Sequence, residues 1–283
     1  MFGRERIELK SIEQMRVMRR AGLVVADALD AVRAALAPGM TTADADAIAA
    51  DVIRAAGATP SFLGYHGYPA TLCVSVNDEI VHGIPGPRVL EPGDVVSVDC
   101  GAIVDGWHGD SAFSLVLPEA DALDVELVET TEAAMWAGIA ALARGDRLGG
   151  VGEAVEDVAD AALARGANGG LRYGVIQEYV GHGIGTAMHQ PPEVLNYRTR
   201  ERGPRLKPGM CLAVEPMLVR GERSTRVLDD EWTVVTEDGS RAAHWEHSVA
   251  LTSEGIVVLT ARDGGAAALK AHGVDVVDLD TLG

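Results

Sequence analysis

The sequence predicts an α+β fold in which helices pack on one curved, largely antiparallel sheet. Two observations lead to this prediction. Helix-like and strand-like segments follow in the order helix, helix, strands, and this order occurs twice along the 283 residues. Two short motifs also recur in the same order, "VHGIPG" as "GHGIGT" and "LEPGDVVSVD" as "LKPGMCLAVE". We therefore expect a duplicated pair of half-domains, about residues 11–118 and 121–260.

The first half opens with two helices and continues in strands. Ser11 and Gln14 have capping-box spacing, and apolar residues follow at helical period until Pro38 and Gly39 end the helix. A shorter helix is expected within 41–57. Strand-like runs then occur at 71–86 and from residue 94 onward, where Asp105-Gly106 is a strong signal for a two-residue hairpin turn.

The second half repeats this order. Helical periodicity is found in two segments, and four strand-like segments follow. The helical segments are 121–145 and 150–166, and the strand-like ones are 210–219, 230–238, 246–253 and 255–260. Residues 1–262 are therefore expected to form one domain, and residues 263–283 a C-terminal tail of unknown role that is either an extra strand or frayed.

Composition limits the possible functions. The net charge of −18 argues against nucleic acid as a main partner, because binding to phosphates depends on clustered Lys and Arg. The three cysteines are odd in number and lie among apolar residues, which favours reduced core thiols. We find no secretory signal pattern and no run of 18 apolar residues, so we expect a cytoplasmic protein that does not cross a membrane.

The predicted hairpin carries two carboxylates inside apolar strands. If Asp105 and Gly106 form the turn, residue 104 pairs with 107, and Asp99 and Asp110 become diagonal neighbours on one face. Such neighbours lie about 7–8 Å apart. Two carboxylates at that distance can converge on a pair of cations about 3.5–4 Å apart, as in two-metal hydrolytic sites. Without a cation they would repel each other in a poorly solvated sheet.

The second half offers residues that could complete such a site. The candidates are His182, His189, Glu215, Glu246 and His247. Mostly carboxylate donors with about one imidazole favour Mn, Fe(II) or Co over softer thiolate-bound ions, and four carboxylates balance two divalent ions. We find no G-x-S-x-G, H-E-x-x-H, phosphate-binding or C-x-x-C motif.

Several of these segments together resemble a known family. They are "SVNDEIVHGIP", "VDCGAIVDGWHGDS", "VGHGIGTAMHQPPEVLNY", "MCLAVEPM" and "WEHSVALT". Over about residues 7–260 the chain is similar to type I methionine aminopeptidases of the pita-bread (creatinase/aminopeptidase-like) fold, without the N-terminal extension that some members carry. The resemblance implies two divalent ions, Co, Mn, Fe or similar. The implied metal ligands are Asp99, Asp110, His182, Glu215 and Glu246, with Asp110 and Glu246 bridging.

The resemblance also implies catalytic and substrate-binding roles. Glu215 is the implied proton acceptor, His189 steadies the developing oxyanion, and His82 lies on the leaving-group side of the peptide. The implied methionine pocket is apolar and aromatic, which suits a thioether. Its candidate residues are Tyr65, Tyr68, Cys73 and Trp232, together with Phe62 and Met188, two positions where this chain departs from the pattern of bacterial members.

The implied activity is removal of the initiator methionine from nascent proteins with a small second residue, by a cytoplasmic monomer working near the ribosome. Two alternatives stay open. One is the proline-specific branch of the same fold, which cleavage of an Xaa-Pro peptide would support. The other is a non-catalytic binding module, which failure to bind divalent ions would support. His66, His108 and His247 are interpreted as structural, and His108 is the one on the same face as Asp99.

Overall fold

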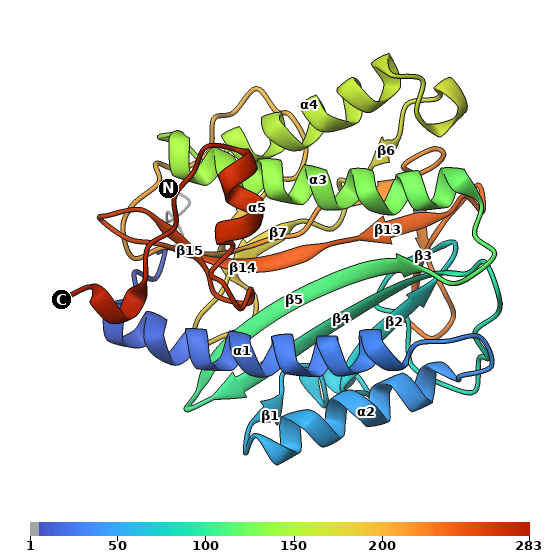
Figure 1. Cartoon of the computed structure of the whole chain (residues 1–283), viewed down its shortest axis with the longest axis horizontal. Coiled ribbons are helices and arrows are strands. Elements are labelled where there is room, and N and C mark those ends of the chain that lie inside the picture. Colours follow the sequence, from blue (N-terminus) through green and yellow to red (C-terminus); the bar gives the residue numbers. More distant parts are fainter. Residues whose placement is uncertain (1–5) are drawn as a thin grey trace.

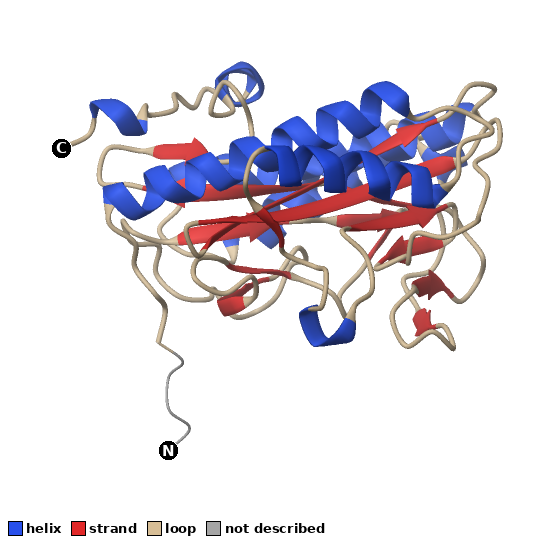
Figure 2. Cartoon of the chain, turned by 90° about the horizontal axis from the view of Figure 1, so that it is seen from below, coloured by secondary structure: helices blue, strands red, loops and turns tan. Residues whose placement is uncertain are grey.

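In the computed structural model, which describes residues 6–283, a long sheet carries its main helices on one face (Figures 1 and 2). Loops, a short 3-10 helix and smaller strands occupy the other face (Figure 2). The helices form two pairs, one from each half of the sequence, as the repeated order predicted. Their bounds are α1 Ile12–Ala35, α2 Thr42–Ala55, α3 Ala122–Arg144 and α4 Gly150–Ala164.

The first half contributes the hairpin at the centre of the sheet. Its strands are β1 Thr59–Pro60, β2 Leu72–Val76, β3 Glu79–Val81, β4 Val95–Val104 and β5 Trp107–Val116. The predicted register is confirmed, since Val104 pairs with Trp107 and Asp99 lies opposite Ala112. Asp105 and Gly106 both have positive φ, 50° and 81°, as a two-residue turn of this type requires.

The second half adds the strands that complete the main sheet and two small sheets. They are β6 Gly174–Val175, β7 Gly181–Gly183, β8 Gln190–Val194, β9 Cys211–Val214, β10 Met217–Val219, β11 Thr225–Val227, β12 Val234–Thr236, β13 Ala242–His244, β14 Glu246–Leu251 and β15 Ile256–Val258. The main sheet has nine strands, in the order β1-β4-β5-β14-β9-β7-β8, with β2 beside β4 and β15 beside β14. Strands of both halves therefore meet at the contact between β5 and β14.

Local sequence explains how α1 forms and packs. Ser11 and Gln14 make the predicted capping box, and the buried apolar face of the helix lies against the hairpin. Gly22 of α1 meets Gly109 of β5 so closely that a Cβ on Gly109 would lie 2.6 Å from the amide nitrogen of Gly22. Gly109 therefore lets α1 lie close to β5, and Gly22 lets the same helix approach the backbone of Leu259, whose carbonyl oxygen would lie 2.3 Å from a Cβ on Gly22.

The duplicated Pro-Gly motifs have the same geometry in both halves. Gly93 and Gly209 each adopt a positive φ, 81° and 97°, and β4 and β9 each begin two residues later. The repeated acids, Asp99 and Glu215, line the same cavity at the centre of the molecule, as the predicted symmetry required. The repeated histidines differ locally, because His82 has a φ of 62° beyond β3 whereas His182 lies within β7.

The tail is ordered against α1. It forms a short helix, α5 Ala266–Ala271, and a 3-10 turn at Leu279–Thr281, so it is neither the extra strand nor the frayed end that the sequence left open. Leu279 and Leu282 pack against Met15 and Met18, and Arg16 donates to the carbonyl oxygen of Leu279. This packing adds apolar burial to a helix that supports the hairpin.

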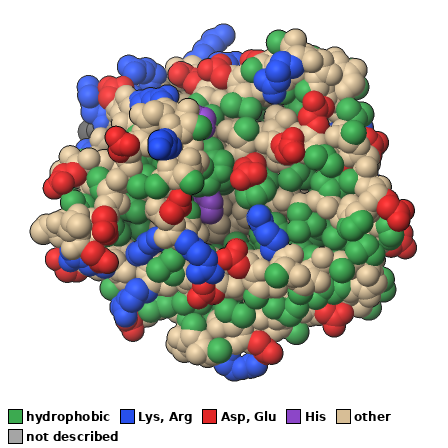
Figure 3. Space-filling model, in the orientation of Figure 1, with side chains coloured by type: hydrophobic (Ala, Val, Ile, Leu, Met, Phe, Trp, Pro, Cys, Tyr) green, Lys and Arg blue, Asp and Glu red, His purple; other side chains and the backbone are tan. Residues whose placement is uncertain are grey.

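Two further expectations concern cysteines and membranes. All three cysteines are free and buried, as predicted: Cys73, Cys100 and Cys211. No helix within residues 6–283 is long and apolar enough to cross a membrane. In the view of Figure 3, acidic and basic side chains are interspersed over the surface rather than gathered into one basic field.

Candidate metal centre

Strand register gathers acidic side chains from distant parts of the chain. Asp99 of β4 lies opposite Ala112 of β5, and Ala112 lies opposite Glu246 of β14. Glu215 directly follows β9, whose Val214 pairs with the residue after Glu246. The three acids therefore lie along one row across four strands, and the alternation of side chains turns them toward the same face.

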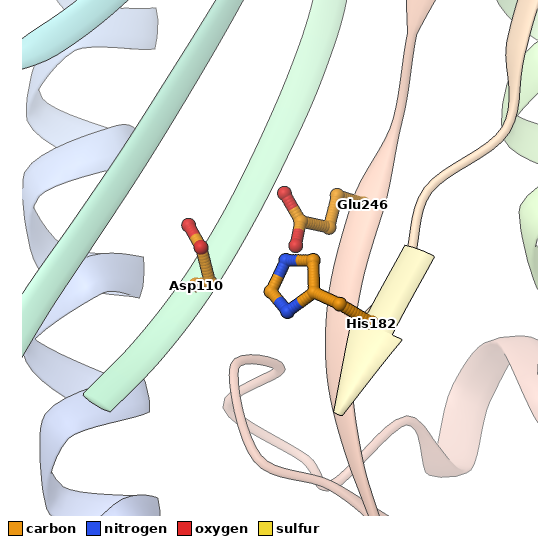
Figure 4. Close-up of side chains that lie close together, drawn as sticks. All are labelled: Asp110, His182 and Glu246. Carbon is orange, nitrogen blue, oxygen red and sulfur yellow. The ribbon is translucent and has the colours of Figure 1, made fainter. Parts of the chain in front are cut away.

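Asp110 lies two residues before Ala112 on β5, so its side chain is on the same face of the sheet as these three acids. It lies opposite Gly101, and its backbone is fixed to β14 by two hydrogen bonds with Ser248, at 3.1 and 2.8 Å. Figure 4 shows the side chains of Asp110, His182 and Glu246 pointing toward one another from three different strands. One donor atom of each lies within 4.8 Å of the other two.

Glycines allow His182 to reach the site. A Cβ at Gly181 or Gly183 would lie 2.3 Å from a backbone oxygen of a neighbouring segment, so only glycine permits β7 to fit there. The His182 Nδ1–H donates to the carbonyl oxygen of Gly183 at 3.0 Å. This bond leaves the Nε2 lone pair facing the site, where it lies 3.4 Å from Oε1 of Glu215.

A second group of donors was missed by the sequence analysis. His244 lies with Glu215 and Glu246, their donor atoms within 4.8 Å of one another, and its Nε2 is 3.6 Å from Oε2 of Glu215. A usable signal existed, because His244 precedes Glu246 by two residues and alternate residues of an extended chain share a face. His247 is also a candidate from the sequence, but its Nδ1 bonds to Thr260 Oγ1 at 2.8 Å, outside both donor groups.

Burial and mutual repulsion shift the protonation of these groups. Burial raises the pKa of Asp99 to about 7 and raises those of Asp110, Glu215 and Glu246 above their usual range. The neighbouring carboxylates raise the pKa of Asp110 and Glu246 further. Burial lowers the pKa of His182 to about 3, so that imidazole is neutral at pH 7. Neutral imidazole is the form that binds metal ions.

Buried side-chain atoms that lack a hydrogen-bond partner indicate whether the site suits a cation. Within residues 6–283, four buried side-chain atoms facing this centre have no hydrogen-bond partner: Asp99 Oδ1, Asp110 Oδ1, His244 Nε2 and Glu246 Oε1. Buried polar atoms are rarely left unpaired in native proteins. Four of them around clustered carboxylates are what a divalent metal centre leaves when its ions are removed, so the residues present fit such a centre.

An apolar cavity of about 230 Å³ adjoins the acidic group. All the predicted pocket residues line it: Phe62, Tyr65, Tyr68, Cys73, Met188 and Trp232. The hydroxyl of Tyr68 donates to backbone carbonyl oxygens at 2.9 and 3.0 Å, which locks its ring in the wall. Phe62 packs over Gly101, where a Cβ would lie 2.9 Å from the Phe62 ring. The cavity thus has a polar, acidic end and an apolar end.

Two more predicted histidines line the same cavity. His189 shares a hydrogen bond of 2.9 Å between its Nδ1 and the Tyr65 hydroxyl, and its ring centroid is 4.3 Å from that of His182. His82 packs edge-on against Trp232, and burial lowers its pKa to about 4.

Three other histidines lie outside the cavity lining. His66 is exposed, and His108 bonds through Nδ1 to Ser61 Oγ at 3.0 Å. The ring of His247 packs at a tilt of 51° against Trp136, with ring centroids 5.0 Å apart. The structural interpretation of these three histidines stays a prediction.

Comparison with known proteins agrees with this geometry. The model of metallopeptidase family M24 matches residues 16–253. The chain is 51% identical to methionine aminopeptidase 1 of Mycobacterium tuberculosis, covering 91% of this chain and 96% of that protein. It is 41% identical to methionine aminopeptidase 1 of Bacillus subtilis, covering 89% and 98%.

Solved structures show the same fold. The methionine aminopeptidase of Thermotoga maritima superposes with a TM-score of 0.84 at 38% identity, covering 90% of this chain and 99% of that one. The prolidase of Pyrococcus furiosus superposes with a TM-score of 0.68 at 18% identity, covering 89% and 65%, a likeness that shows the fold alone. The predicted pita-bread fold is confirmed by these superpositions.

Proposed function

The chain belongs to metallopeptidase family M24, among the methionine aminopeptidases, and we propose that it uses two divalent ions to release N-terminal methionine from chains with a small second residue. One observation carries the proposal. A single cavity joins a buried group of carboxylates and histidines to an apolar, aromatic wall. The first end suits a metal-dependent hydrolase, and the second suits a thioether side chain.

We assign the ions to the five residues that the family resemblance implies. These are Asp99, Asp110, His182, Glu215 and Glu246, with Asp110 and Glu246 shared between the two positions. Divalent ions bound there would supply Lewis acidity, lowering the pKa of a bound water and polarising the scissile carbonyl. The free α-amine of the substrate would bind at this centre, which would restrict cleavage to the first peptide bond.

Side chains around the centre would handle protons and orient the substrate. We assign Glu215 as the proton acceptor, as the family resemblance implies; one of its oxygens lies 3.4 Å from His182 and the other faces His244. We assign His189 to the developing oxyanion, with the Tyr65 hydroxyl fixing the orientation of its ring. His82, across the cavity beside Trp232, would contact the peptide on the leaving-group side.

The apolar end would bind the methionine side chain. Phe62, Tyr68, Cys73 and Met188 form one buried cluster, against which Tyr65 and Trp232 pack. A buried wall of aromatic and sulfur-containing side chains favours a flexible thioether over a charged side chain. We therefore propose that selectivity for the first residue lies in this cluster.

Release of methionine from short peptides tests the function directly. The protein, stripped with a chelator and reloaded separately with Mn, Co or Fe(II), should release methionine from Met-Ala-Ser and much less from Met-Lys-Ser. Asp110→Asn is the matched loss-of-ligand variant and should lose both activity and ion binding. Absence of methionine release with every ion would refute the proposal, and cleavage of an Xaa-Pro dipeptide instead would assign the chain to the proline-specific branch.

We further propose the cellular setting that this activity needs. The substrate is the N-terminus of a nascent polypeptide, so the protein would act in the cytoplasm near the ribosome. We propose that it acts as a monomer, with residues 1–262 as the catalytic domain and residues 263–283 as a supporting tail. Size-exclusion chromatography with light scattering tests the first point, and a variant ending at residue 262 tests the second.

A further inference from the structure

We propose that His244 is a sixth metal donor, whose Nε2 binds the ion shared by Glu215 and Glu246. The proposal rests on the two-ion centre proposed above. The family resemblance implies five ligands, and His244 is not one of them. It would add a second imidazole to the centre, besides that of His182.

The geometry points to two donor groups that share one residue. Asp110, His182 and Glu246 form the first group, and Glu215, His244 and Glu246 form the second. In each group the three donor atoms lie within 4.8 Å of one another. Glu246 belongs to both groups, as expected for a carboxylate that bridges two ions.

The His244 side chain is buried and has no other partner for its inward nitrogen. It is 2% exposed, and Nε2 forms no hydrogen bond within the described residues. Its backbone is held rigidly, because its N–H and C=O both bond to Ser114 Oγ at 2.8 Å and β13 pairs with β10 opposite Met217. A buried, unpaired imidazole nitrogen on a fixed strand is costly unless it has a ligand.

The separation from Glu215 favours a shared ion over a direct hydrogen bond. Nε2 and Glu215 Oε2 are 3.6 Å apart, which is beyond the usual hydrogen-bond range of about 2.7–3.2 Å. Two atoms that each lie about 2.1 Å from one ion are separated by at most about 4.2 Å. The observed distance therefore fits two donors of a single cation.

An additional imidazole would change the metal preference of the position that it joins. Imidazole nitrogen is a softer donor than carboxylate oxygen, and nitrogen donors favour ions later in the Mn to Co series. Loss of His244 should therefore weaken binding of the ion that Glu215 and Glu246 share.

Proton NMR of the full chain loaded with two equivalents of Co(II) counts the bound imidazoles. Each imidazole on Co(II) gives one exchangeable, strongly shifted N–H resonance. We expect two resonances in the wild-type protein and one in H244Q. Calorimetric titration should show that one of the two Co(II) ions binds at least about tenfold more weakly in H244Q. His272→Gln, a histidine of the tail remote from the cavity, is the matched control and should keep both resonances.

A single imidazole resonance in wild-type protein that holds two Co(II) ions would overturn the proposal, and so would unchanged affinities for both ions in H244Q. If circular dichroism shows that H244Q does not fold, the number of imidazole resonances in the wild-type protein tests the proposal by itself. Methionine release from Met-Ala-Ser separates the two proposals. An active protein with one imidazole resonance refutes only the role of His244, whereas two resonances without methionine release refute the proposed function.

Discussion

Asp99→Asn should stabilise the metal-free protein at pH 8 although it removes a residue assigned to the metal centre. Burial raises the pKa of Asp99 from 3.8 to about 7. Each pKa unit corresponds to about 1.36 kcal/mol, so ionised Asp99 costs the fold on the order of 4 kcal/mol. Water in the cavity reduces this cost, and a buried amide adds about 1–3 kcal/mol of its own. We expect a net gain of about 2 kcal/mol in the free energy of unfolding.

The size of this gain depends on pH. A carboxyl with a raised folded pKa holds its proton in the native state and loses it in the unfolded state between pH 3.8 and about 7. Stability of the wild-type protein therefore falls as pH rises through that window. The advantage of Asp99→Asn should be greatest at pH 8 and should shrink below pH 7.

Urea unfolding of chelator-treated protein at pH 8 and pH 5 measures this effect. Asp94→Asn is the matched control, because Asp94 is buried outside the site and accepts hydrogen bonds from Asn77 and Glu91, so its variant should be less stable. Saturating Mn should reverse the order of wild type and Asp99→Asn, since an ion at 100 times its Kd adds about 2.7 kcal/mol. A metal-free Asp99→Asn protein no more stable than wild type at pH 8 would refute the reasoning.

Three further predictions concern the ions and the pocket. Affinity for Mn should fall at least about tenfold per pH unit below pH 7, because protons on Asp99 and on Asp110, Glu215 and Glu246, whose pKa values burial also raises, compete with the ion. His182, with a pKa of about 3, stays neutral, and calorimetry at pH 7 and pH 5.5 measures the change. Tyr65→Phe should lower kcat on Met-Ala-Ser by about tenfold with little change in KM, since His189 loses the bond that orients it. Phe62→Ala should raise KM by about tenfold and admit bulkier first residues, which a panel of tripeptides measures.

Clear outcomes would contradict each of these predictions. If the affinity for Mn were the same at pH 7 and pH 5.5, binding of the ion would displace no proton from the site. Equal kcat for Tyr65→Phe and for the control Tyr197→Phe, a partly buried tyrosine outside the cavity lining, would remove the proposed role of the hydroxyl. An unchanged substrate range in Phe62→Ala would place selectivity elsewhere in the cavity.

Local sequence was sufficient for the hairpin and the helix start. Asp105-Gly106 fixed the turn, the turn fixed the register, and the register put Asp99 and Asp110 on one face. Each step depends on residues close in the chain, so the pattern alone could predict it. The capping box of Ser11 is local in the same sense, and it formed as expected.

The short strands of the second half could not be predicted in this way. β7 has three residues and β8 contains two prolines, so neither shows the alternation that identifies a strand. They form because backbone groups pair with partners far along the chain. His244 was missed for a related reason, since β13 is a three-residue strand and its contact with Glu215 depends on long-range pairing.

The sequence by itself determined the chemistry available to this protein. Four strand-interrupting carboxylates, the glycine-flanked His182 and the duplicated Pro-Gly motifs indicate a two-ion hydrolytic centre. Only the tertiary structure decided which side chains lie together as possible ligands of one ion. These side chains come from strands that are far apart in the sequence and pair only in the folded protein. It placed His244 beside Glu215 and turned His247 away, and the physical reason is that a one-residue step along an extended strand reverses the face that a side chain occupies.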